Sequence, residues 1–122
     1  MKVKWFVAYS LIFADIQRKL QEEIDQTIED CDGNLPDYNT LQAMPYLEQV
    51  ITETLRLHAA APIITRVCSK EYQFEGTPIK LKTNDAIHIN VMAIHRDPQH
   101  YPEPLKFDPE RFSKEGKANR HP

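Results

Sequence analysis

The chain has 122 residues, of which 41% are hydrophobic and 27% charged, so it is not compositionally disordered and suits one domain or part of one. Its net charge is −3, and no stripe of Lys and Arg interleaves with aromatic residues, which argues against a nucleic-acid-binding surface. The two cysteines, Cys31 and Cys68, form neither a disulfide framework nor a zinc-binding pattern, and reduced thiols are expected.

The N-terminal segment allows two interpretations. A basic start at residues 1–4 and an apolar run over residues 5–14, ending on a small residue, resemble a signal peptide. The run is too short to span a bilayer. Because it continues without a turn into an amphipathic sequence, we favour one continuous helix whose apolar end packs in a core. A secreted chain, cleaved near Ala14, is the alternative.

Two main helices are predicted in the first half of the chain. The first has an apolar residue at every fourth position and ends at the turn of residues 31–34 (Ile16, Leu20, Ile24, Ile28). The second covers residues 45–59 between two prolines and has one face formed by Leu47, Val50, Ile51 and Thr54. Between them, Asn39 or Thr40 is placed to cap a short helix.

The second half changes to the period of β-strands. Four short strands are predicted at residues 63–68, 71–74, 78–82 and 86–92. Their short connections predict antiparallel hairpins, with one buried face formed by Ile79, Leu81, Ile87, Ile89 and Val91. Four prolines between residues 98 and 109 then predict an extended, proline-stiffened meander. The predicted class is α+β, with a mostly helical first half followed by small antiparallel hairpins and this meander.

An acid and a base lie one turn apart on the apolar second helix. An exposed pair such as Glu53 and Arg56 contributes only about 0.2–0.5 kcal/mol. Here the neighbouring residues are apolar, and a shielded pair must have all its hydrogen bonds completed. Arg carries more donors than one carboxylate accepts, so a further partner is expected. We predict that Arg111 joins them, and that the three side chains clamp the meander to the helix rather than catalyse a reaction.

Several motifs resemble those of the cytochrome P450 haem-thiolate monooxygenases. Residues 53–56 (ETLR) look like the ExxR motif of the family, and residues 109–112 (PERF) match its PERF motif. The sequences HRDP at 95–98, YPEP at 101–104 and IQRKLQEEID at 16–25 are also typical of it. The resemblance runs from residue 15 to residue 112, in a style closest to microsomal, insect-like members. It implies that residues 1–122 are a single partial domain of this fold, from the tail of the oxygen-binding helix through the PERF region.

The resemblance assigns roles to particular positions. Glu53, Arg56 and Arg111 would form the structural triad of the family behind haem b, and Arg66 would bind a haem propionate. A substrate-contacting turn would follow the ExxR helix (Ala60, Ala61, Pro62, Ile63, Ile64). No residue is expected to be catalytic, and none is expected to bind a metal.

The sequence also departs from the family pattern. In the family, a cysteine in a glycine-rich loop soon after PERF binds the iron, and the sequence stops at residue 122, before that loop is expected. Neither Cys31 nor Cys68 lies in such a pattern, and the five histidines have no recognised ligand spacing. We therefore expect that this chain alone does not form a thiolate-ligated haem.

The resemblance implies a parent enzyme that inserts one oxygen atom from O2 into an apolar small molecule. That enzyme would receive electrons from an NADPH-dependent reductase at the cytoplasmic face of the endoplasmic reticulum membrane. The chain itself is expected to be inactive and cytoplasmic, without nucleic-acid partners and without the membrane association of the parent. The alternative is that it acts as a non-enzymatic interaction module or is an inert truncated remnant.

Overall fold

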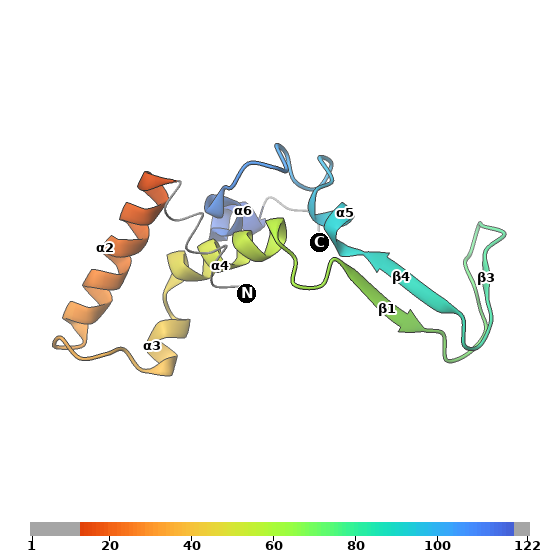
Figure 1. Cartoon of the computed structure of the whole chain (residues 1–122), viewed down its shortest axis with the longest axis horizontal. Coiled ribbons are helices and arrows are strands. Elements are labelled where there is room, and N and C mark those ends of the chain that lie inside the picture. The colour runs from red at the N-terminus through yellow and green to blue at the C-terminus, as the bar shows by residue number, and fades with distance from the viewer. Residues whose placement is uncertain (1–12, 119–122) are drawn as a thin grey trace.

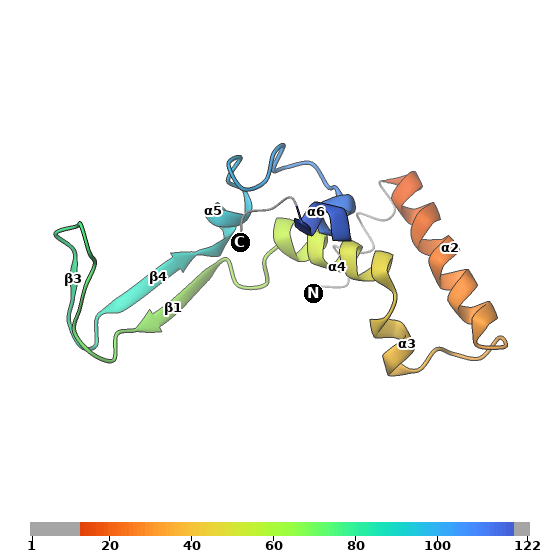
Figure 2. The same cartoon turned by 180° about the vertical axis from the view of Figure 1, so that it is seen from behind.

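The computed structural model describes residues 13–118. Figures 1 and 2 show an elongated molecule, with the helices gathered at one end and a long two-stranded ribbon extending from the other. The mixture of helices with small antiparallel sheets confirms the predicted α+β class. Most of the predicted continuous helix and of the signal peptide falls on residues 1–12, which lie outside the described part of the chain. The helix does not continue through Phe13, which is the N-cap of α2 with non-helical backbone angles (φ −113°, ψ 86°), so the prediction of one unbroken helix was wrong at this residue.

Helix α2 (Ala14–Asp30) and the short helix α3 (Tyr38–Gln42) precede the central helix. Of the four apolar residues predicted on one face of α2, only Leu20 is buried. The predicted turn after α2 is present, with Gly33 in the left-handed region at φ 76°. The predicted cap of α3 was wrong by two or three residues. Asp37 caps this helix, because its carboxylate accepts a hydrogen bond of 2.7 Å from the Thr40 amide.

The central helix α4 (Pro45–Leu57) begins at its proline, as predicted, and ends two residues earlier than expected. Its buried residues are Val50, Glu53, Thr54, Arg56 and Leu57. Ile51, which was predicted on the buried face, is 43% exposed. The error arose because the charged side chains of α4 face the interior, so the buried side of the helix is rotated away from its most apolar stripe.

A small apolar core lies where α2 crosses α4. It consists of Leu20, Val50, Leu57 and Phe107, with Ile16, Tyr46 and Leu47 packed against it. Full burial of one such side chain stabilises a fold by roughly 1.5–3 kcal/mol. Because Phe107 comes from the proline-rich segment, this core joins the segment to both helices.

The strands pair in a nested order rather than as consecutive hairpins. Strand β1 (Ile63–Val67) pairs with β4 (Ala86–Asn90), and β2 (Tyr72–Gln73) pairs with β3 (Lys80–Leu81) as a hairpin between them. The antiparallel direction was predicted correctly, but the β1–β4 pairing was missed. Local turn signals cannot show it, because the pairing encloses the β2–β3 hairpin. Ile79 and Ile89 are 55% and 40% exposed, so the predicted buried face was also wrong.

The segment after β4 contains more helix than its prolines predicted. Helix α5 (Val91–His95), the 3-10 helix η1 (Pro109–Phe112) and helix α6 (Lys114–Ala118) all fall within it. Asn90 begins α5 by accepting a hydrogen bond of 3.0 Å from the Ala93 amide, which ends the strand at that point. The prolines stiffen the path between α5 and η1, which follows the outside of α4 (Figures 1 and 2).

Candidate functional site

Glu53 and Arg56 form a buried, two-pronged ion pair on α4. Arg56 donates from Nε to Glu53 Oε2 at 2.6 Å and from Nη2 to Glu53 Oε1 at 2.8 Å. The Glu53 side chain is fully buried and that of Arg56 is 2% exposed. A pair so far from solvent has lost its hydration, so its other donors and acceptors must be satisfied by the protein.

Backbone carbonyls at the end of α5 and in the meander supply those partners for Arg56. Nη1 donates to the carbonyl oxygens of His95 at 2.7 Å and Pro104 at 2.8 Å, and Nη2 donates to that of Lys106 at 3.3 Å. Together with the two bonds to Glu53, these use all the donor positions of a guanidinium. One side chain of α4 therefore holds the end of α5 and two separate points of the meander.

Glu53 in turn fixes the chain just before η1. Its Oε1 accepts a hydrogen bond of 2.9 Å from the amide of Asp108. The same oxygen lies 3.7 Å from Nε of Arg111, whose side chain is 13% exposed. Arg111 also donates from Nη2 to the carbonyl of Glu103 at 3.2 Å. The structure thus brings Glu53, Arg56 and Arg111 together, with Arg111 at a longer distance than Arg56.

The HRDP sequence (residues 95–98) makes further contacts with the backbone at the end of α4. The ring Nδ1 of His95 lies 3.2 Å from the carbonyl oxygen of Arg56, and Arg96 donates from Nη2 to that of Leu57 at 3.2 Å. A cation near the last carbonyls of a helix also complements its dipole. The sequence alone assigned no role to this motif. It begins at His95, the last residue of α5, and nothing in the local sequence indicates that it meets the end of α4.

Two nearby groups complete the surroundings of the cluster. The Arg56 guanidinium carbon lies 5.0 Å from the centre of the Tyr101 ring, a cation–π distance. At the end of α4, burial and the nearby Arg96 charge lower the pKa of His58 below its ordinary value of 6.5. His58 is therefore driven toward its neutral form in the folded chain.

The other predicted site residues lie away from this cluster. Arg66 is exposed on β1 and donates from Nη1 to the neighbouring Thr65 carbonyl at 3.0 Å. The predicted substrate-contacting residues follow α4 and lead into β1, and all but Ile64 are exposed (Ala60, Ala61, Pro62, Ile63, Ile64). The carbonyl of Pro62 accepts a hydrogen bond of 3.2 Å from the Met92 amide, which ties this turn to α5.

Comparison with known proteins decides the family. The family profile described as "Cytochrome P450" matches residues 3–122. The chain belongs to the cytochrome P450 family. It is 47% identical over 109 residues to "Cytochrome P450 9e2" of Blattella germanica, a match that covers 88% of this chain and 20% of that relative.

Other relatives come from insects and from mammals. "Probable cytochrome P450 6a14" of Drosophila melanogaster is 45% identical over 108 residues, covering 88% of this chain and 21% of the relative. "Cytochrome P450 3A16" of Mus musculus is 44% identical over 118 residues, covering 96% and 23%. The chain spans about a fifth of the length of the curated relatives it matches.

Haem is the cofactor of cytochrome P450 proteins, and one residue of this chain has the right chemistry to hold part of it. Within residues 13–118, no carboxylate forms an ion pair with Arg66. Its guanidinium donates to the Thr65 carbonyl, and a planar guanidinium suits a carboxylate such as a propionate. The donor set on β1 therefore fits that side group of haem.

The two cysteines of this cytochrome P450 chain differ in burial and in position. Cys68 is 8% exposed and its thiol donates to the Lys70 carbonyl at 2.8 Å. Cys31 is half-buried in the turn after α2. Between residues 13 and 118, no group of three or more His, Cys, Asp and Glu side chains is placed to hold a metal ion.

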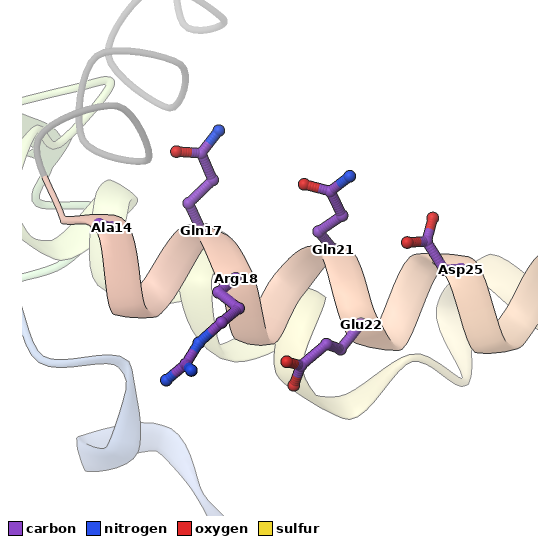
Figure 3. A pocket seen from close by; sticks show the side chains of 6 residues that line it. All are labelled: Ala14, Gln17, Arg18, Gln21, Glu22 and Asp25. Atoms are coloured by element: carbon purple, nitrogen blue, oxygen red, sulfur yellow. The ribbon is translucent and has the colours of Figure 1, made fainter.

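A hollow on the outer side of α2 is polar and open. Figure 3 shows its six lining side chains, all of which belong to this single helix (Ala14, Gln17, Arg18, Gln21, Glu22, Asp25). It contains no aromatic residue and offers no enclosed apolar surface for a small molecule. None of the helices in the described range is both long enough and apolar enough to cross a bilayer.

Proposed function

We propose that this chain is the part of a haem monooxygenase that anchors the meander behind the haem. On this proposal, residues 1–122 belong to one partial cytochrome P450 domain, from the tail of the oxygen-binding helix through the PERF region. Glu53, Arg56 and Arg111 act as its structural triad. The supporting observation is the buried Glu53–Arg56 pair, which holds one carbonyl at the end of α5 and two carbonyls and one amide of the meander.

The cluster has the features of a scaffold rather than of a reaction centre. All the donors of Arg56 are used within the protein, so none is left to bind a substrate. Glu53 is fully buried, so its carboxylate offers no accessible surface to a substrate. Its role would be to keep the segment up to PERF at a constant distance from α4.

Arg66 and the turn after α4 would face the cofactor and the substrate. Arg66 would hold one haem propionate through its free donors, and haem would supply oxygen activation. The turn would provide part of an apolar wall (Ala60, Ala61, Pro62, Ile63, Ile64). Its exposed methyl and methylene groups suit an apolar small molecule, which would lose contact with water on binding.

The proposed parent reaction consumes O2 and two electrons. One oxygen atom enters a C–H bond of the substrate, and the other leaves as water with two protons. The electrons would come from NADPH through a reductase, at the cytoplasmic face of the endoplasmic reticulum membrane. We propose that the 122-residue chain does not carry out this reaction alone, because neither cysteine lies in the thiolate loop of the family.

A carbon monoxide difference spectrum tests the proposal for the isolated chain. The chain would be mixed with excess haem, reduced and exposed to carbon monoxide. We expect no thiolate-type Soret shift, and a Cys68→Ala variant should give the same spectrum as the unchanged chain. A thiolate-type shift that disappears in Cys68→Ala would contradict the proposal, since it would make Cys68 an iron ligand.

A non-enzymatic role is the second candidate, and exposed apolar side chains favour it. Ile51 and Leu55 lie one turn apart on α4 and are 43% and 41% exposed, and Leu105 of the meander is 71% exposed. Such a surface can bind a protein partner. A monomeric, protease-resistant chain without haem would support an interaction module, whereas aggregation relieved only by the rest of the domain would support an inert remnant.

A further inference from the structure

Helix α4 lacks a cap from its own sequence at its N-terminus. Met44 occupies the N-cap position and its side chain makes no capping hydrogen bond. Pro45, the first helical residue, has no amide hydrogen to satisfy. The amides of Tyr46 and Leu47 come next, and they need acceptors from elsewhere because helix geometry gives them none.

A single carboxylate from another helix accepts both of these bonds. The Tyr46 amide donates to Glu23 Oε1 at 2.8 Å, and the Leu47 amide donates to Glu23 Oε2 at 2.8 Å. Glu23 lies on α2 and is half-buried. Its negative charge also meets the positive end of the α4 dipole, so the contact is favoured by charge as well as by hydrogen bonding.

Other contacts between α2 and its neighbours lie close to Glu23. Leu20, one turn before Glu23, packs against Val50 and Leu57 of α4. Lys19 lies over the Tyr46 ring, with Nζ 5.6 Å from its centre, and pairs with Glu110 of η1 at 3.0 Å. Glu23 is the member of this junction that bonds directly to the backbone of α4.

We propose that Glu23 is a positioning residue for the cluster of Glu53, Arg56 and Arg111. By binding two successive amides, Glu23 fixes the position of α4 along its helix axis and its rotation about that axis. Glu53 lies about two turns further along the same rigid helix, and a shift of one residue moves it by about 1.5 Å. Such a shift would break the 2.9 Å bond between Glu53 and the Asp108 amide.

Amide hydrogen exchange in the 122-residue chain tests this role. Three variants would be compared with the unchanged chain: Glu23→Ala, Glu23→Gln and, as the matched control, Glu22→Gln. Glu22 is the preceding residue on the outer side of α2, exposed to solvent (Figure 3). The exchange rates to follow are those of Tyr46, Leu47 and Asp108, with the Cys68 amide of the ribbon as an internal reference.

Removal of the carboxylate should loosen the start of α4 and, through it, the Glu53 contact. In Glu23→Ala we expect exchange about tenfold faster at Tyr46 and Leu47, the size of a lost cap, and severalfold faster at Asp108. Glu23→Gln should be intermediate, because its amide keeps one oxygen acceptor. Glu22→Gln should leave all the rates unchanged, and the Cys68 rate should not change in any variant.

Three results would overturn the proposal. Unchanged rates at Tyr46 and Leu47 would show that Glu23 does not cap α4. Faster exchange there with an unchanged rate at Asp108 would show a local cap without a positioning role. Equal acceleration at Cys68 would show general destabilisation. If Glu23→Ala does not fold, the Glu23→Gln rates decide by the same criteria.

A second measurement uses the unchanged chain. Scalar coupling between the Tyr46 and Leu47 amide nitrogens and the Glu23 carboxyl carbon must be detectable, and its absence would also contradict the proposal.

Discussion

Arg56 and His95 exchange hydrogen bonds with each other's backbone, 39 residues apart in sequence. Arg56 donates to the His95 carbonyl at 2.7 Å, and the His95 ring nitrogen Nδ1 lies 3.2 Å from the Arg56 carbonyl. A carbonyl can only accept, so Nδ1 must carry the proton in this bond. These two hydrogen bonds join the end of α4 to the point where α5 leads into the meander.

The first prediction concerns this His95 bond. We expect His95→Phe to lower the free energy of unfolding by about 1 kcal/mol, through the loss of one hydrogen bond to a half-buried carbonyl. His95→Asn should retain most of the stability, because its side-chain nitrogen can occupy the place of Nδ1. Urea unfolding followed by circular dichroism measures both. Equal losses in the two variants would show that ring packing, and not the hydrogen bond, matters at this position.

The second prediction concerns the buried pair. Arg56→Met should lower the free energy of unfolding by about 3–5 kcal/mol, because it leaves the buried Glu53 carboxylate without its closest charge partner and three carbonyls without a donor. In a chain with little stability to spare, this appears as unfolding at 25 °C. The control is Arg18→Met, whose partner Asp15 is 3.4 Å away on the exposed side of α2, and which should cost almost nothing.

An apolar replacement of the same pair separates charge from packing. The double variant Glu53→Leu with Arg56→Met should be less destabilised than Arg56→Met alone, since no buried charge is left unpaired. Hydrogen exchange at the Asp108 amide should nevertheless be faster, because Glu53 no longer accepts its bond. A double variant less stable than either single variant would show that the ion pair itself stabilises the chain.

The third prediction ranks the two arginines around Glu53. Arg111→Ala should cost less than Arg56→Ala, on the order of 1–2 kcal/mol, because Arg111 is partly exposed and 3.7 Å from Glu53. Arg111→Lys should recover part of the loss through its charge. The same unfolding experiment measures both. A loss as large as that of Arg56→Ala would mean that Arg111 carries more of the clamp than its distance indicates.

The fourth prediction is a pH dependence that comes from His58. Burial and the Arg96 charge lower the pKa of His58 below 6.5, so the folded chain binds fewer protons there than the unfolded chain. The free energy of unfolding should therefore fall as the pH decreases below 6.5 toward the lowered pKa. His58→Gln should reduce this fall, whereas a matched change at the exposed His100 should not. An identical pH profile in His58→Gln would exclude this origin.

The fifth prediction tests the proposed haem contact in the haem-loaded protein that contains this segment. Arg66→Ala should release haem to an apoprotein acceptor about tenfold to a hundredfold faster, the size of a lost charge-assisted bond. Arg66→Lys should be intermediate because it keeps the charge without the planar fork. Lys82→Ala, a change beside the β2–β3 hairpin, is the control and should leave release unchanged. Unchanged release in Arg66→Ala would remove the propionate role.

The sequence by itself determined the two main helices, the positions of the strands and the charged residues of the cluster. Apolar spacing and prolines placed α2 and α4 because those signals act within a few residues of the chain. The period of two located the strands in the same way. The choice of Glu53, Arg56 and Arg111 also came from the sequence, through a physical requirement: a shielded carboxylate and guanidinium need further partners.

Only the tertiary structure decided which distant groups meet. The β1–β4 pairing, the amides of Tyr46 and Leu47 on Glu23, and the three carbonyls on Arg56 had no local pattern. Their partners are backbone groups, which every residue carries, so side-chain identity does not distinguish one from another. Which of them meet is decided by the packing of α2 and the meander against α4, and that packing depends on the whole described chain at once.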